Sequence, residues 1–147
     1  MRSKSFLSVL TSILMLGTTT DRASAEPASW ELISKIEITE IEKTDRWEVR
    51  KTYPAELRDM ADSFRIRGFY VPVEAQAFVQ SFLLVPDPAD CPFCGNGGYG
   101  LSLEVHVRKA MPDLPEGTDI TVEGRLELLD SDDTYQAVIL RDAQLLP

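Results

Sequence analysis

Two cysteines are the residues of this sequence whose type and spacing most directly suggest chemistry. They lie three positions apart in the segment Asp90-Cys91-Pro92-Phe93-Cys94-Gly95. In a Cys-Pro-x-Cys-Gly turn both thiolates can face one metal ion, and the glycine lets a backbone N–H approach a sulfur without a Cβ in the way. Because thiolates select soft metals, the turn predicts a site for Zn²⁺ or Cu⁺ ligated by Cys91 and Cys94.

This turn supplies only two of the four ligands that a structural zinc site takes. The other ligands would come from His106, the one histidine of the sequence, together with a carboxylate, or from the same turn of a second protomer. The candidate carboxylates are Asp87, Asp90 and Glu104. The first arrangement binds one ion per chain, whereas the second predicts a homodimer that shares one ion.

Two other interpretations of the cysteine turn stay open. Cys-Pro-x-Cys is also the active-site turn of glutaredoxin-like oxidoreductases, in which a long helix after the turn lowers the pKa of the first thiol. Here the glycine-rich segment 95–100 follows and cannot form that helix, which leaves a thiol redox role on a fold other than that of thioredoxin. The third interpretation is a local disulfide, which would stabilise the fold by only about 2 kcal/mol because the closed loop is so short.

The rest of the sequence offers little for catalysis. It contains no Gly-x-Ser-x-Gly nucleophile elbow, and its single histidine is expected on the polar face of a strand beside Glu104. Asp130, Asp132 and Asp133 lack the later Gly and Glu that a calcium-binding EF-hand needs, so we expect them in a solvated turn. The sequence therefore favours a protein that is not an enzyme.

The first 25 residues have the pattern of a secretory signal peptide. Arg2 and Lys4 precede an apolar run over 6–16, and Ala23-Ser24-Ala25 matches a cleavage site of small residues. The run is shorter than the roughly 20 apolar residues of a membrane span, so we expect a periplasmic or secreted protein without membrane insertion. The formal net charge of −9 disfavours nucleic-acid binding and leaves an envelope protein as the expected macromolecular partner.

The elements that must position the cysteines are mainly strands. A Pro at 54 and apolar residues at 57, 60 and 61 predict a short helix over 53–61. Alternation of apolar and polar residues predicts strands over 64–72, 101–108 and 120–128, a continuous apolar run predicts a buried strand over 78–85, and a fifth strand is expected over 135–140. Between 30 and 51 the pattern is mixed, with one helical turn near 30–33 and a short strand near 36–38.

Five short strands without a strand–helix–strand alternation predict a mainly β protein. We expect a small antiparallel five-stranded OB-like barrel with one or two short helices, and an inward face that includes Ile66, Leu103, Val105, Val122 and Leu126. The expected domain organisation is a signal peptide over 1–25, an N-terminal extension over 26–62 whose short helix packs on the barrel, and the barrel itself over 63–147. The cysteines then lie in a connection, 86–100, that is long for a strand loop.

The order of several short motifs resembles a family of exported bacterial proteins catalogued as domain of unknown function 3299. The motifs are WEL at 30–32, RGFYVPVE at 67–74, FLLVP at 82–86, CPFC at 91–94 and TVEGRL at 121–126. The resemblance covers about residues 30–145 and implies an exported OB-like β domain. It also implies a link to metal supply, because some members are encoded beside membrane transport components with that role. Not all members keep both cysteines, and the family carries over no catalytic residues.

These observations predict an exported small binding module whose cysteine loop binds zinc or copper and which is accessory to metal handling in the envelope. The alternatives are a periplasmic protein-interaction module whose loop is closed by a structural disulfide, and a thiol redox protein without the thioredoxin fold.

Overall fold

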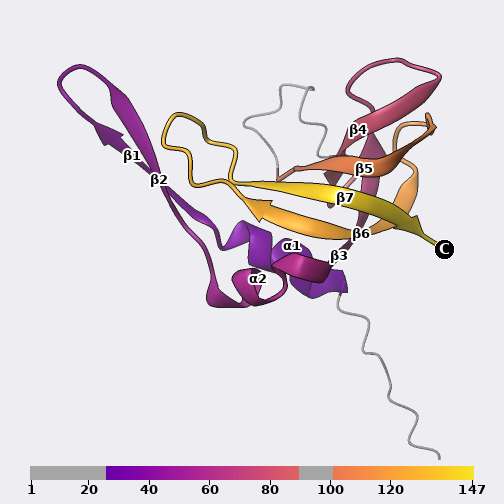
Figure 1. The fold of residues 1–147 in the computed structure, drawn as a ribbon, viewed down its shortest axis with the longest axis horizontal. Coiled ribbons are helices and arrows are strands. Elements are labelled where there is room, and N and C mark those ends of the chain that lie inside the picture. The colour runs from indigo at the N-terminus through magenta and orange to yellow at the C-terminus, as the bar shows by residue number, and fades with distance from the viewer. Residues whose placement is uncertain (1–25, 90–100) are drawn as a thin grey trace, which may run out of the picture.

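The computed structural model describes residues 26–89 and 101–147 (Figure 1). Its helices are α1 (Glu26–Ser34), α2 (Ala55–Asp59) and the single 3₁₀ turn η1 (Ala61–Ser63). Its strands are β1 (Glu37–Glu42), β2 (Trp47–Thr52), β3 (Phe64–Val71), β4 (Phe78–Val85), β5 (Leu103–Pro112), β6 (Asp119–Leu128) and β7 (Val138–Leu146). Among these described residues no helix has the length and apolar character needed to cross a membrane.

Strands β3 to β7 form a closed barrel in the order β3-β4-β5-β7-β6, with β6 pairing back to β3. The prediction of a five-stranded OB-like barrel is confirmed, but the expectation that all its pairs are antiparallel is wrong for one pair. β5 runs parallel to β7, with Glu104 opposite Ile139 and Val105 opposite Leu140. The reason is geometric: strands in a closed ring cannot all alternate in direction when their number is odd, so one neighbouring pair must be parallel.

The inward face of the barrel follows the period-two pattern of the sequence. Ile66, Leu103, Val105 and Val122 are completely buried, and Leu126 is 3% exposed, which confirms the predicted inward positions. Alternate residues of a strand point to opposite faces of the sheet, and burying one apolar face supplies the main driving force for folding. The other large side chains in this core include Phe64, Tyr70, Phe82, Leu84 and Leu140.

The bounds of several elements differ from the prediction. The helix expected over 53–61 is divided into α2 and η1, and the fifth strand begins later and ends later than 135–140. The mixed segment before residue 52 forms α1 and a two-stranded hairpin of β1 and β2. This hairpin stands away from the barrel in Figure 1 and is not part of its sheet.

Helix α1 packs against β3 through side chains that bond to its backbone. Ser29 Oγ donates to the carbonyl of Arg65 at 2.7 Å, and Trp30 Nε1 donates to the carbonyl of Arg67 at 2.6 Å. Ile33 of α1 and Leu57 of α2 are buried in the same cluster as the barrel core. The two helices therefore extend the core beyond the barrel itself.

A buried tyrosine connects β3 to the turn that precedes β6. The Tyr70 hydroxyl donates to Asp113 Oδ1 at 2.5 Å, and its backbone bonds to Thr118 and Gly117. Burial first, and then the hydrogen bond to Asp113, raise the pKa of Tyr70 to about 12. An unfolded tyrosine ionises near pH 10, so the unfolded state loses this proton first as the pH rises, and the free energy of unfolding falls between about pH 10 and 12.

We expect Tyr70→Phe to lower the free energy of unfolding at pH 7 by about 1 kcal/mol, because one buried hydrogen bond is lost. The variant should also lose less stability between about pH 10 and 12 than the parent protein. Urea titrations at pH 7, 10 and 11.5 measure both effects. Burial raises the pKa of Tyr53 as well, so a residual alkaline loss is expected in Tyr70→Phe, and an unchanged alkaline loss would contradict the assignment to Tyr70.

Candidate functional site

The segment that carries the two cysteines begins and ends on adjacent strands of the barrel. Cys91 and Cys94 themselves, like Asp90, lie outside the described residues. Leu84 of β4 is opposite Leu103 of β5, so the chain leaves the barrel and returns to it at one place. Glu104 and His106 come directly after Leu103, and because they are two residues apart they share the outer face of β5.

His106 has a hydrogen-bond partner on each ring nitrogen. Its Nε2 lies 2.6 Å from Glu104 Oε1, and Nη1 of Arg141 lies 3.1 Å from its Nδ1. A guanidinium group only donates hydrogen bonds, so Nδ1 accepts and Nε2 carries the proton that is donated to Glu104. This pattern fixes the ring in one orientation, with Nε2 toward Glu104 and Nδ1 toward Arg141.

The partners of His106 belong to a wider polar cluster on the outside of the barrel. Arg141 of β7 also donates to Glu127 Oε2 of β6 at 2.6 Å, and Gln136 donates to Glu104 Oε2 at 2.5 Å. We name these five residues the β5–β7 cluster. It joins three strands and the 129–137 loop, and the sequence alone predicted only the proximity of Glu104 and His106.

Both carboxylates of the β5–β7 cluster have lowered pKa values. Burial raises the pKa of Glu104, but hydrogen bonds from His106 and Gln136 and the nearby positive charges outweigh it, so the net shift is downward. The hydrogen bond from Arg141 lowers the pKa of Glu127. Two carboxylates thus share the Arg141 guanidinium and the His106 ring, and the charge of Arg125 also lowers the pKa of Glu127.

The described residues do not by themselves assemble a metal centre. Within 26–89 and 101–147 no three His, Cys, Asp or Glu side chains are grouped so that they could hold an ion. Asp87 is exposed near the end of β4, and its Oδ1 accepts from the backbone N–H of Ala89 at 2.8 Å. Of the predicted ligands, the structure therefore places His106 beside Glu104 and leaves the association with the cysteines as a prediction.

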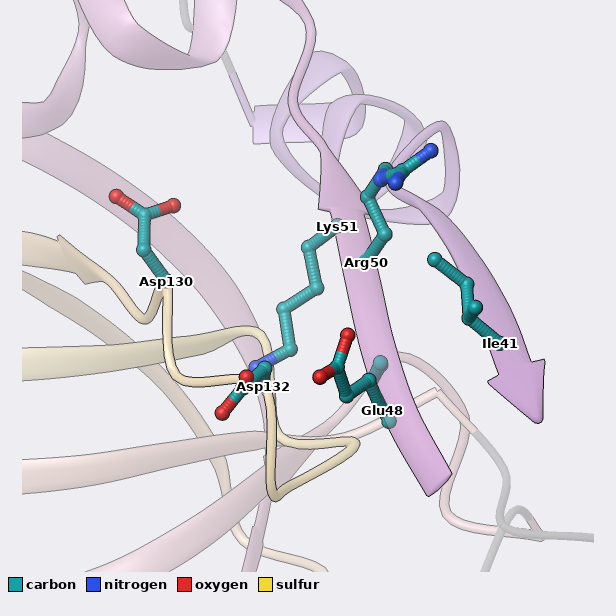
Figure 2. Close-up of a pocket in the computed structure, with 7 residues that line it drawn as sticks. Ile41, Glu48, Arg50, Lys51, Asp130 and Asp132 are labelled. Atoms are coloured by element: carbon teal, nitrogen blue, oxygen red, sulfur yellow. The ribbon is translucent and has the colours of Figure 1, made fainter. Parts of the chain in front are cut away.

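A second polar feature lies between the hairpin and the 129–137 loop, and the sequence did not reveal it. A cavity of about 210 Å³ is lined by Ile41, Glu48, Val49, Arg50, Lys51, Asp130 and Asp132. Figure 2 shows how the labelled side chains from the hairpin and the loop surround it. Lys51 extends across it and donates through Nζ to the carbonyls of Ser131 at 2.7 Å and Leu129 at 3.1 Å. Burial lowers the pKa of Lys51, and the neighbouring aspartates only partly offset that effect.

The turn at 130–133 is therefore more than a solvated turn. Its carboxylates are exposed as expected, but its backbone is bound by the hairpin: the N–H of Val49 donates to the carbonyl of Asp132 at 2.8 Å. The Tyr53 hydroxyl contacts the carbonyls of Leu129 at 2.7 Å and Ala137 at 3.0 Å. These contacts hold the hairpin against the 129–137 loop, and the Lys51 side chain is hydrogen-bonded between the two segments.

Two exposed aromatic rings extend the contact between hairpin and loop. Trp47 and Tyr135 stack with centroids 5.3 Å apart and an interplanar angle of 17°, and each is 49% exposed. The Tyr135 hydroxyl also donates to Glu40 of β1. The residue that was expected to begin the fifth strand instead fixes the hairpin to the loop.

Comparison with protein-family models, curated proteins and solved structures finds no match to this chain.

Proposed function

We propose that this protein is an exported, non-enzymatic binding module that takes a thiophilic metal ion, Zn²⁺ or Cu⁺, at the Cys91/Cys94 loop and the adjoining outer face of β5, as an accessory to metal handling in the envelope. The observation that carries the proposal is the barrel order. β4 and β5 are the second and third strands of an OB-like barrel, and in OB folds the face of those strands binds oligonucleotides and oligosaccharides. Leu84 and Leu103 are paired across these strands, so the chain that follows the cysteine segment enters β5 one residue before Glu104 and three residues before His106.

The hydrogen bonds of His106 indicate which ring nitrogen would serve as a ligand. Metal-bound histidines usually donate their other ring N–H to a carboxylate, which orients the ring. Nε2 already makes that bond to Glu104, so Nδ1 is the nitrogen that would bind the ion. Arg141 would then lose its hydrogen bond to Nδ1 and retain the one that it donates to Glu127. In this proposal Glu104 is a positioning residue and Arg141 competes with the ion.

Zinc titration of the reduced chain from residue 26 onward tests the proposal. If His106 completes the site, we expect one ion per chain, proton release on binding and weaker binding as the pH falls, because thiolates are the ligands. His106→Ala should then weaken binding about as much as Cys94→Ser does. Arg141→Gln should strengthen it, because that variant removes the positive charge beside Nδ1.

The mass of the protein in solution separates the two ways of completing the site. One ion per two chains, with dimerisation on metal addition and no effect of His106→Ala, would assign the other ligands to a second protomer. No saturable binding of micromolar Zn²⁺ or Cu⁺ would reject the metal proposal. Arg141→Gln is the informative control. Damage to the fold would weaken metal binding, whereas the proposal expects this variant to bind the ion more tightly.

A second candidate is a periplasmic interaction module whose loop is closed by a disulfide. It is favoured by the saturation of both ring nitrogens of His106 within the protein. The state of the two sulfurs distinguishes the candidates, since a disulfide places them about 2.05 Å apart, whereas zinc would lie about 2.3 Å from each. Thiol counting on protein taken directly from the oxidising compartment gives the same answer in solution.

A further inference from the structure

Within the described part of the chain, the β1–β2 hairpin has one edge that is already bound and one that is open. On the β2 side the backbone N–H of Val49 bonds to the carbonyl of Asp132, and Lys51 fixes the same turn. On the β1 side no backbone hydrogen bond from the described residues reaches the outer edge of the strand. An open strand edge is a template for pairing with another extended chain.

The register identifies which backbone groups this edge presents. The N–H of Lys43 bonds to the carbonyl of Arg46 at 2.8 Å, so these two residues form a hydrogen-bonded pair. Such pairs alternate with non-hydrogen-bonded pairs along an antiparallel ladder, which makes the pair of Glu40 and Val49 a non-hydrogen-bonded one. The outward bond of Val49 to Asp132 agrees with this assignment.

The same alternation applies to β1. The N–H and C=O groups of Ile38, Glu40 and Glu42 point away from β2, because their partners Lys51, Val49 and Trp47 stand in non-hydrogen-bonded pairs. These three residues also share one face of the hairpin, since they are two residues apart. Ile38 is 43% exposed on this face.

The edge is held in place before any partner arrives. Trp47 stacks on Tyr135, and Tyr135 donates to Glu40. Lys51 donates to the carbonyls of Leu129 and Ser131. Figure 1 shows the hairpin standing away from the barrel, with β1 along its outer side. A preorganised strand loses less conformational entropy on binding than a disordered one.

The side chains of the edge define the chemistry of the occupant. β1 has the sequence EITEIE, with three carboxylates and no basic residue. A second copy of this chain fits poorly, because antiparallel pairing centred on Glu40 would place two Glu40 side chains directly opposite each other, and like charges in that position destabilise a sheet. A strand with basic residues would instead place opposite charges there.

We propose that the outer edge of β1 binds an extended segment of a partner protein by strand addition. The segment carries Lys or Arg opposite Glu42 and Glu40 and an apolar residue opposite Ile38. Because it pairs antiparallel to β1, its sequence from N- to C-terminus is basic–x–basic–x–apolar. Backbone bonds to Ile38, Glu40 and Glu42 supply affinity, and alternate side chains supply specificity. This surface is separate from the β5–β7 cluster, and the inference does not rest on metal binding at the cysteine loop.

The test uses the full chain from residue 26 onward, without added metal, and a synthetic peptide Thr-Lys-Thr-Lys-Thr-Val-Thr with blocked ends. Calorimetric titration at low ionic strength should show saturable binding that weakens with added salt, because exposed charge pairs are screened. The peptide with Glu in place of both Lys should bind about 10-fold or more weakly, since two opposite-charge pairs become like-charge pairs.

Two variants of one residue separate backbone pairing from side-chain contact. Ile38→Pro removes an N–H that points away from β2, so the hairpin ladder keeps its bonds while the edge loses a donor. Ile38→Thr keeps the donor and retains a β-branched side chain. We expect Ile38→Pro to abolish peptide binding and Ile38→Thr to weaken it only a few fold, with the thermal unfolding midpoints of both variants close to that of the parent.

Three results would overturn the inference. They are equal binding of the Lys and Glu peptides, undiminished binding by Ile38→Pro, and self-association of the parent protein that Ile38→Pro abolishes. The last result would assign the edge to a second copy of this chain.

Discussion

Replacing Val122 by Asp is expected to unfold the barrel at 25 °C. Val122 lies on β6 opposite Ile66 of β3 and Leu145 of β7, and its side chain is completely inaccessible to solvent. An Asp there would bury a carboxylate with no partner, which costs several kcal/mol. The whole stability of a domain of this size is about 5–15 kcal/mol, and we expect this penalty to exceed it.

Far-UV circular dichroism and urea titration measure this effect. The matched control is Val73→Asp, which introduces the same charge in place of the same residue type at a position that is 50% exposed; it should change the free energy of unfolding by less than about 0.5 kcal/mol. Val122→Asn separates polarity from charge and should fall between the two. Equal urea midpoints for Val122→Asp and Val73→Asp would contradict the position of Val122 in the core.

Replacing Gly124 by Ala is expected to destabilise the barrel by about 2–3 kcal/mol, a large cost for one methyl group. A Cβ at this position would lie 2.6 Å from the carbonyl oxygen of Arg141 and 3.0 Å from the Cα of Ala143. Both are backbone atoms of β7, so β6 and β7 must move apart to make room, and overpacking of this kind typically costs 1–3 kcal/mol. Gly124 is also where the register between these strands shifts.

Urea titration with Ala110→Val as the control tests the prediction for Gly124. Ala110 is an exposed position on β5, and the added methyl groups there should leave the free energy of unfolding within about 0.5 kcal/mol of the parent. A Gly124→Ala variant as stable as Ala110→Val would show that the two strands do not approach as closely as the structure has them.

The candidate site was only partly accessible to sequence reasoning. Glu104 and His106 could be placed together, because residues two apart on a strand share a face. The sequence could not add Arg141, Glu127 and Gln136 to this pair. They come from β7, β6 and the 129–137 loop, and the residues around each of them do not indicate which strand it will contact. The charge balance of the β5–β7 cluster is thus a property of the barrel closure.

The sequence by itself determined the class of the fold, the main strands of the barrel and their inward faces. Strict alternation at Leu103 and Val105, or at Val122 and Leu126, already separates the buried side of a strand from its polar side, because a pleated strand directs successive side chains to opposite faces. It also determined that the two cysteines come between β4 and β5.

Only the tertiary structure decided the parallel pairing of β5 with β7, the hairpin and its attachment to the 129–137 loop. The end of β7 shows the physical reason: the apolar run ends at Leu140, where the pattern predicted the strand to finish, yet the strand continues to Leu146. Asp142 adopts a φ of 53°, and the register with β5 and β6 shifts around this point. An irregular residue of this kind interrupts the local pattern. The strand continues beyond it because β7 pairs with both β5 and β6, and only the closed barrel brings these strands together.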